Sequence, residues 1–153
     1  MERWMPTLDD LLNEPNTPLV RRAANKADLR AWIGEADKKL RDARNTDISE
    51  STRMDAAYDA VFFCALGVLS TQGCRATARP GHHVKVLEAA AIVMKTPQRL
   101  QDSVEALQDW RNRKYVAAFL ATEGDVAEAI ETAQTYQAKV FDWLQANAAT
   151  LLK

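Results

Sequence analysis

The sequence predicts an all-α protein, an up-and-down bundle of four main helices preceded by a short N-terminal helix. Three observations support this fold class. Apolar residues recur at intervals of three and four along most of the chain, which is the period of a helix with one buried face. No stretch alternates apolar and polar residues as a half-buried strand does. Five glycines and five prolines among 153 residues leave little turn chemistry for a sheet-rich protein.

The apolar pattern divides the chain into an N-terminal arm and a bundle domain. In the arm, residues 1–25, Thr7 can cap a short helix that reaches about Asn13 before prolines end it. The bundle domain, residues 26–153, has five expected helices, each with an apolar stripe: about 26–44, 54–69, 84–94, 97–121, and from 125 to near the end. Residues 123–125 are expected to end one helix and cap the next. Short connections favour antiparallel neighbours.

Composition and charge exclude several classes of protein. A net charge of −1 argues against a surface devoted to nucleic acid or anionic membranes, although a local basic patch is still allowed. No leader segment and no uninterrupted apolar stretch long enough to cross a bilayer is evident, so we expect no membrane association and a cytoplasmic protein, by default bacterial. Cys64 lies in an apolar helix and Cys74 in the following loop, and together they form no metal or redox motif.

The familiar enzyme motifs are absent from the sequence. A di-iron bundle needs Glu-x-x-His pairs, but His82 and His83 are the only histidines and neither follows a glutamate by three residues. There is also no glycine-rich phosphate loop, no zinc-protease helix and no nucleophile elbow. We therefore expect neither a metal ion nor a cofactor.

Arg111 occupies an unusual position on an apolar helix face. At about 100° per residue, Arg111 lies near the midline of the stripe, whereas Arg113 points the opposite way. A buried guanidinium is costly unless it is paired or faces a cleft. One interpretation pairs Arg111 with a carboxylate such as Asp59 or Glu88, in the core or in a dimer interface. The other places it at a groove that binds phosphate or ribose, where Tyr115 could stack or hydrogen-bond.

The segment Gly81, His82 and His83 opens the helix expected at 84–94. Adjacent histidines on a helix point about 100° apart, so these two cannot readily hold one metal ion together. They are either a solvent-exposed helix start or a histidine near a helix N-terminus that contacts an anion or a partner chain.

Several short segments, taken in order, resemble the HEPN superfamily over about residues 50–145. They are the run Tyr58, Asp59 and Ala60 in an apolar helix, the break at Gly73, the Gly-x-His loop at 81–83, and the pair Arg111 and Asn112. The resemblance implies an α-helical up-and-down bundle that is usually dimeric. In active members it also implies metal-independent RNA cleavage in a cleft between two protomers.

The ribonuclease motif of that superfamily is an arginine, often followed by asparagine, and a histidine after four to six intervening residues. Arg111 and Asn112 match its first half, but positions 116–118 hold no histidine. Tyr115, just before them, is a poor general base near neutral pH because its ordinary pKa is about 10.

The leading hypothesis is an HEPN-like module, non-catalytic or weakly active, that binds RNA, a nucleotide or a protein partner. The resemblance implies settings such as toxin–antitoxin pairs, mobile elements and defence systems. The candidate binding residues are Arg111, Asn112, Tyr115, His82, His83 and Asp59. A competing hypothesis is an active ribonuclease in which Arg111 works with Tyr115, or with His82 or His83 from another helix. A third is a pure interaction scaffold.

We also expect a homodimer. Four tryptophans and largely apolar long helices leave more hydrophobic face than one bundle of this size covers. The resemblance likewise implies arginine-bearing helices that meet across a two-fold interface.

Overall fold

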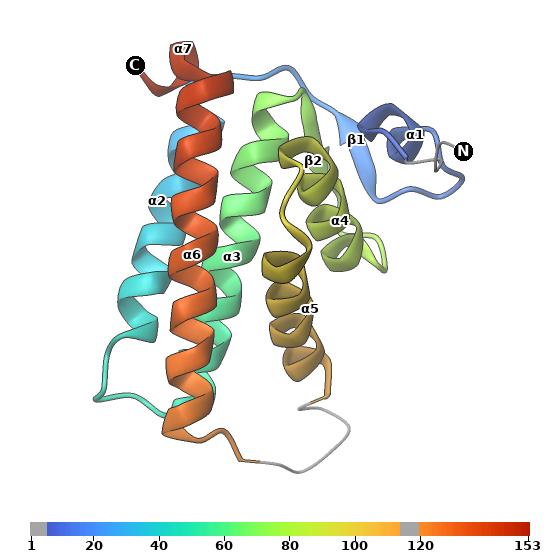
Figure 1. The fold of residues 1–153 in the computed structure, drawn as a ribbon. Coiled ribbons are helices and arrows are strands. Elements are labelled where there is room, and N and C mark those ends of the chain that lie inside the picture. The colour runs from blue at the N-terminus through green and yellow to red at the C-terminus, as the bar shows by residue number, and fades with distance from the viewer. Residues whose placement is uncertain (1–5, 114–119) are drawn as a thin grey trace.

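A computed structural model describes residues 6–113 and 120–153, and it confirms the all-α fold class. The helices are α1 (Leu8–Leu12), α2 (Lys26–Ala43), α3 (Glu50–Thr71), α4 (His82–Met94), α5 (Gln98–Arg113), α6 (Glu123–Asn147) and α7 (Ala149–Leu152). In Figure 1, α2, α3, α5 and α6 run alternately down and up, and α4 and the N-terminal arm lie on one side of them.

Helix α3 is the centre of the bundle. Helices α2, α4, α5 and α6 all pack against it, and its buried residues surround the helix instead of forming one stripe. Among the described residues, α3 is the one helix long and apolar enough to cross a membrane by length and composition. Most of that stretch is buried inside the protein, as expected for the core helix of a soluble protein.

The start of α6 differs from the prediction. Residues 123–125 do not end one helix and cap the next, because they form the first turn of α6. Thr122 is the N-cap: its hydroxyl accepts a hydrogen bond from the Asp125 backbone, and the Asp125 carboxylate accepts one from the Thr122 backbone. The preceding helix also does not reach 121, since Leu120 and Ala121 lie outside any helix. The same capping box forms at Thr7 and confirms the predicted start of α1.

A two-stranded antiparallel ribbon, which the sequence did not predict, links the arm to the bundle. Strand β1 (Leu19–Arg21) pairs with β2 (Cys74–Ala76), with Leu19 opposite Ala76. Three residues per strand are too few to show an alternating pattern. On α4, the ammonium group of Lys85 lies 2.9 Å from a carboxylate oxygen of Glu14. The ribbon and this ion pair together fix the start of α4 against the arm.

Among the described residues, Arg53, near the start of α3, is the one charged residue that is buried in the bundle. Only 6% of its side chain is exposed. Its Nε donates to the carbonyl of Ala43 at 2.8 Å, at the end of α2, and its Nη1 donates to the carboxylate of Glu123 at 3.2 and 3.3 Å, at the start of α6. One guanidinium therefore joins the ends of three helices and satisfies a carbonyl that the helix itself leaves without a partner.

We expect the substitution Arg53→Ala to destabilise the fold strongly. It removes the donor from the Ala43 carbonyl and leaves a cavity in a buried site, which together cost about 3 kcal/mol of unfolding free energy. For a chain of this length the melting temperature should fall by about 6–12 °C. Thermal denaturation followed by circular dichroism measures this change. Arg41→Ala, which removes an exposed arginine from the same end of α2, is the matched control and should shift melting by less than about 2 °C.

Candidate functional site

Three helices bring together one tyrosine, one histidine and one arginine. Tyr58 comes from α3, His83 from the first turn of α4 and Arg111 from the last turn of α5. The guanidinium carbon of Arg111 lies 5.2 Å from the centre of the Tyr58 ring, within the range of a cation–π contact. The Tyr58 hydroxyl lies 2.8 Å from Nδ1 of His83. We call these three residues the Tyr-His-Arg cluster.

The histidines are positioned by the turn that opens α4. Gly81 adopts a φ of 83°, in the left-handed region that favours glycine, directly before the helix. The His83 ring stacks on Phe62 of α3 with a centroid distance of 4.2 Å, and the His82 ring meets the same phenylalanine edge-on at 6.2 Å. Both histidines are half-buried. The start of α4 is therefore packed against the core and is not simply a solvent-exposed turn.

His83 is neutral at physiological pH. Burial, together with the positive charge of Arg111, lowers the pKa of His83 to about 4. Burial also raises the pKa of Tyr58, so its hydroxyl keeps its proton. Among the described residues, His83 is the one hydrogen-bond partner of that hydroxyl. A buried O–H needs an acceptor. The tyrosine therefore donates to Nδ1, and the ring proton of His83 lies on Nε2.

Within the described part of the chain, Arg111 pairs with neither of the predicted carboxylates. Asp59 lies 3.7 Å from the ammonium group of Lys39, and Glu88 lies 3.2 Å from that of Lys85. Burial raises the pKa of Asp59, and Lys39 and Arg111 both oppose this shift. Arg111 therefore does not pair with Asp59 or Glu88 inside its own bundle. Pairing with a carboxylate across a dimer interface stays a prediction.

The other predicted binding residues differ in how closely they approach the Tyr-His-Arg cluster. Asp59 follows Tyr58 on α3 and is close enough for Arg111 to lower its pKa. Asn112 is exposed, and its side-chain oxygen accepts from Nη1 of Arg111 at 3.5 Å, a long contact. His82 contacts the His83 ring, with centroids 4.4 Å apart. Tyr115 lies outside the described residues.

The sequence pattern did not reveal the part that Tyr58 and Phe62 play in the site. Both fit the apolar stripe of α3, so periodicity placed them in the core. The one available signal was a tyrosine beside an aspartate in the middle of an otherwise apolar helix, because a buried hydroxyl needs a partner from another element.

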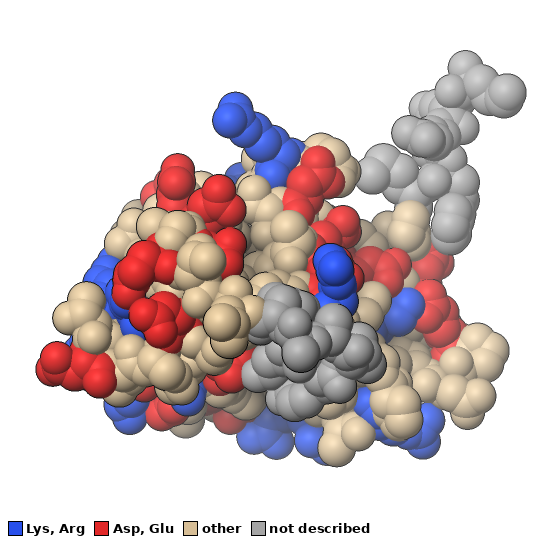
Figure 2. All heavy atoms as spheres, turned by 90° about the horizontal axis from the view of Figure 1, so that it is seen from below, with Lys and Arg blue, Asp and Glu red and all other residues tan. Residues whose placement is uncertain are grey.

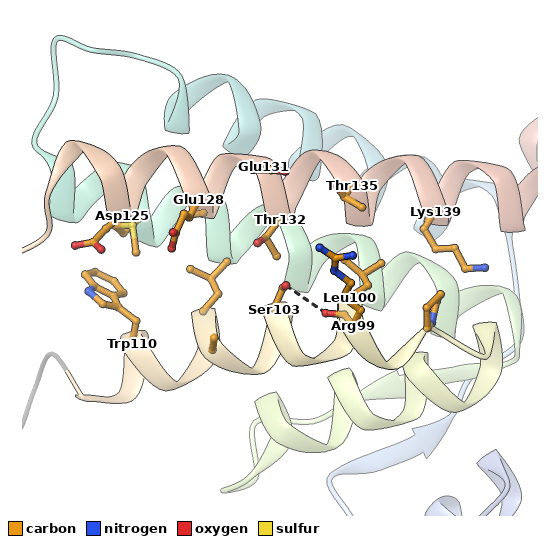
Figure 3. A pocket seen from close by; sticks show the side chains of 15 residues that line it. Arg99, Leu100, Ser103, Trp110, Asp125, Glu128, Glu131, Thr132, Thr135 and Lys139 are labelled. Carbon is orange, nitrogen blue, oxygen red and sulfur yellow. Dashed lines mark hydrogen bonds between the residues drawn. The ribbon is translucent and has the colours of Figure 1, made fainter.

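A cavity of about 720 Å³ lies between α5 and α6 but contains none of the predicted site residues. Figure 3 shows Trp110, Asp125 and Glu128 at one end of it and Lys139 at the other. The charged groups are spread along the cavity and do not converge on one point. Among the residues in the ranges 6–113 and 120–153, no three metal-ligating side chains form a group that could hold a metal ion.

The charge at the lower end of the bundle does not single out a broad binding face. Figure 2 shows acidic and basic side chains interspersed over the lower end of the bundle, in keeping with the net charge of −1. Recognition of an anion would therefore depend on local groups such as the Tyr-His-Arg cluster and not on the field of the whole protein.

Comparisons of the chain with models of known protein families, with curated proteins and with solved structures find no match.

We expect nuclear magnetic resonance to find His83 neutral, with its proton on Nε2, down to about pH 5. The reason is the pKa near 4 that burial and Arg111 impose, against about 6.5 for an ordinary histidine. A proton–nitrogen correlation spectrum of ¹⁵N-histidine-labelled His82→Gln protein contains His83 alone and reports both the charge and the tautomer. A ring that titrates near pH 6.5 would contradict the assignment.

The lowered pKa of His83 also makes the free energy of unfolding depend on pH. The unfolded chain takes up a proton at His83 near pH 6.5, but the folded chain does so only near pH 4. Protonation of the unfolded state therefore lowers the free energy of unfolding as the pH falls from about 6.5 to about 4. In His83→Gln, urea denaturation should show a smaller loss of stability between pH 7 and pH 5 than in the wild type.

Proposed function

We propose that this chain is an HEPN-like helical protein that binds RNA, with the Tyr-His-Arg cluster as its phosphate site. The observation that carries the proposal is the meeting of Arg111 and His83 at one place on the surface. Within the described residues, no carboxylate forms an ion pair with Arg111. A half-buried guanidinium without a carboxylate partner is suited to an anionic ligand.

The chemistry of the cluster favours a phosphate. The guanidinium of Arg111 presents parallel N–H donors that match two phosphate oxygens. The neutral His83 ring adds a further donor at Nε2, since Tyr58 holds its Nδ1. Hydrogen bonds to an anion are stronger at a half-buried site than in water.

A ribonuclease is the second candidate, because α4 brings a histidine to the arginine that the HEPN resemblance would make catalytic. Such cleavage would need a base to take the proton of a ribose 2′-hydroxyl as its oxygen attacks the adjacent phosphorus and the 5′-oxygen leaves. In the observed arrangement Nδ1 of His83 is occupied by the Tyr58 hydroxyl and Nε2 carries a proton. Neither nitrogen is available as a base until that hydrogen bond is rearranged. The geometry therefore favours binding over cleavage.

The proposal includes a homodimer in the cytoplasm and a protein partner, such as a cognate toxin or antitoxin. Val84, directly after the two histidines, is 54% exposed. An exposed apolar side chain beside the cluster supports an interface that a second copy would cover.

We expect Arg111→Ala to weaken RNA binding without unfolding the protein. Loss of one phosphate contact should reduce affinity for a fluorescent single-stranded oligoribonucleotide by about tenfold or more and lower the salt slope by about one. The melting temperature should fall by no more than about 3 °C, because only a half-exposed cation–π contact is lost. Arg113→Ala is the matched control: this arginine is 63% exposed and lies 3.6 Å from Asp109 on its own helix.

The RNA recovered from the binding mixture, analysed on a denaturing gel, distinguishes an RNA-binding protein from a ribonuclease. Binding without strand scission supports the binding function. Scission that Arg111→Ala and His83→Gln both abolish would establish the ribonuclease instead. Strong destabilisation by Arg111→Ala with unchanged RNA affinity would overturn the phosphate site.

We expect sedimentation velocity at micromolar concentration to show a dimer. Val84→Glu would place a charge in the proposed interface and should shift the protein to the monomer. A wild-type protein that sediments only as a monomer would refute this part of the proposal.

A further inference from the structure

A second cavity, of about 600 Å³, lies next to the Tyr-His-Arg cluster. It lies between α2, the outer side of α3, and the segment that leads from β2 into α4. Phe62 and His82 line it, and these same residues contact the His83 ring on the cluster side. The cavity and the cluster are therefore neighbouring parts of one surface. We call this cavity the aromatic groove.

Aromatic rings form a continuous row from the aromatic groove to Arg111. Trp32 of α2 stacks on Phe63 of α3 with centroids 5.7 Å apart, and Phe63 lies 6.5 Å from Phe62. Phe62 stacks in turn on Tyr58 at 6.2 Å, over whose ring Arg111 lies. The outer rings of this row, Trp32 and Phe63, are half-buried. Parts of their surfaces thus remain accessible to a planar ligand.

Of the charged side chains that line the aromatic groove, one cation is available to a ligand. Asp28 is bound by Arg22 at 2.6 Å, and Glu35 is bound by Lys38 at 3.1 Å. The remaining charged residue of the lining is Arg75 of β2, which is exposed. Among the residues described, it forms no ion pair. Both carboxylates are thus already neutralised, and Arg75 can receive an anion.

We propose that the aromatic groove is a base-binding subsite, so that the ligand is single-stranded RNA with a base stacked in the groove. This proposal rests on the RNA-binding function proposed above. A groove walled by rings and flanked by cations suits a strand whose bases alternate with phosphates: a base contacts Trp32 or Phe63, and phosphates contact Arg111 and Arg75. Bases in a duplex are paired and stacked on one another, so their faces cannot enter the groove.

The decisive comparison uses two strands of equal length and charge. One is an adenosine oligoribonucleotide, and the other is the same ribose-phosphate chain without bases. Since stacking on a protein ring contributes about 1–3 kcal/mol per base, the wild type should bind the adenosine strand about fivefold or more tightly than the abasic strand. A duplex of the same length carries twice the charge but offers no base face to the groove, so Trp32→Leu should leave its affinity unchanged. Fluorescence anisotropy of labelled strands measures all three affinities.

Three variants locate the preference for bases. Trp32→Leu should reduce adenosine-strand affinity towards that of the abasic strand while leaving the abasic affinity unchanged. Trp143→Leu, on α6 and outside the lining of the groove, is the matched control and should keep the preference. Arg75→Ala removes an exposed side chain, so folding is not at issue. It should weaken binding of both strands alike and lower the salt slope by about one.

The outcomes distinguish this proposal from the one on which it rests. If neither strand binds, the RNA-binding function itself fails. If both strands bind but their affinity does not depend on Arg111, the phosphate site at the Tyr-His-Arg cluster is overturned. If both single strands bind equally well and depend on Arg111, the phosphate site stands and the base subsite is overturned. A duplex whose affinity falls in Trp32→Leu as much as that of the adenosine strand would also overturn it. The wild-type comparison needs no variant, so the proposal remains testable if Trp32→Leu does not fold.

Discussion

Helix α3 has almost no face turned to solvent, and the rest of the structure depends on that constraint. Neighbouring elements must supply a partner for each polar side chain of this helix that cannot reach its own backbone, because burial without a partner costs free energy. The Arg53 guanidinium finds its partners at the ends of α2 and α6. Asp59 finds Lys39 on α2, and the Tyr58 hydroxyl finds His83 on α4. The contacts that complete the core thus also place a histidine beside Arg111.

The net charge of the Tyr-His-Arg cluster depends on how its side chains are buried against one another. Burial and the neighbouring guanidinium keep His83 neutral, so Arg111 supplies the only full positive charge of the three residues. An anion bound there would oppose the effect of Arg111 and favour the protonated ring. Phosphate binding at this site would therefore be coupled to proton uptake by His83. The coupling follows from half-burial, since a fully hydrated histidine would respond little to either neighbour.

Periodicity was enough to predict the main helices and the inward side of Arg111, because both depend on local spacing. It did not predict elements of only a few residues or contacts between residues that are far apart in the chain. Strands β1 and β2 have three residues each, too few for a pattern. Gly124 resembles a helix stop, yet the Thr122 capping box overrides it. The contact between Tyr58 and His83 joins two helices through a turn at Gly81, which no spacing rule predicts.

The pairing of β1 with β2 bears on the order in which the molecule can fold. Helices α2 and α3 are consecutive in the chain and share the most extensive packing, so they can associate early at a low cost in loop-closure entropy. The ribbon instead joins segments on opposite sides of that helical pair in the chain. Pairing of the two strands before the intervening hairpin has folded would cost more loop-closure entropy. We therefore expect the histidine turn, which the ribbon helps to anchor, to form after the helical pair. A chain without its first two dozen residues would lack β1 and thus the ribbon that anchors this turn.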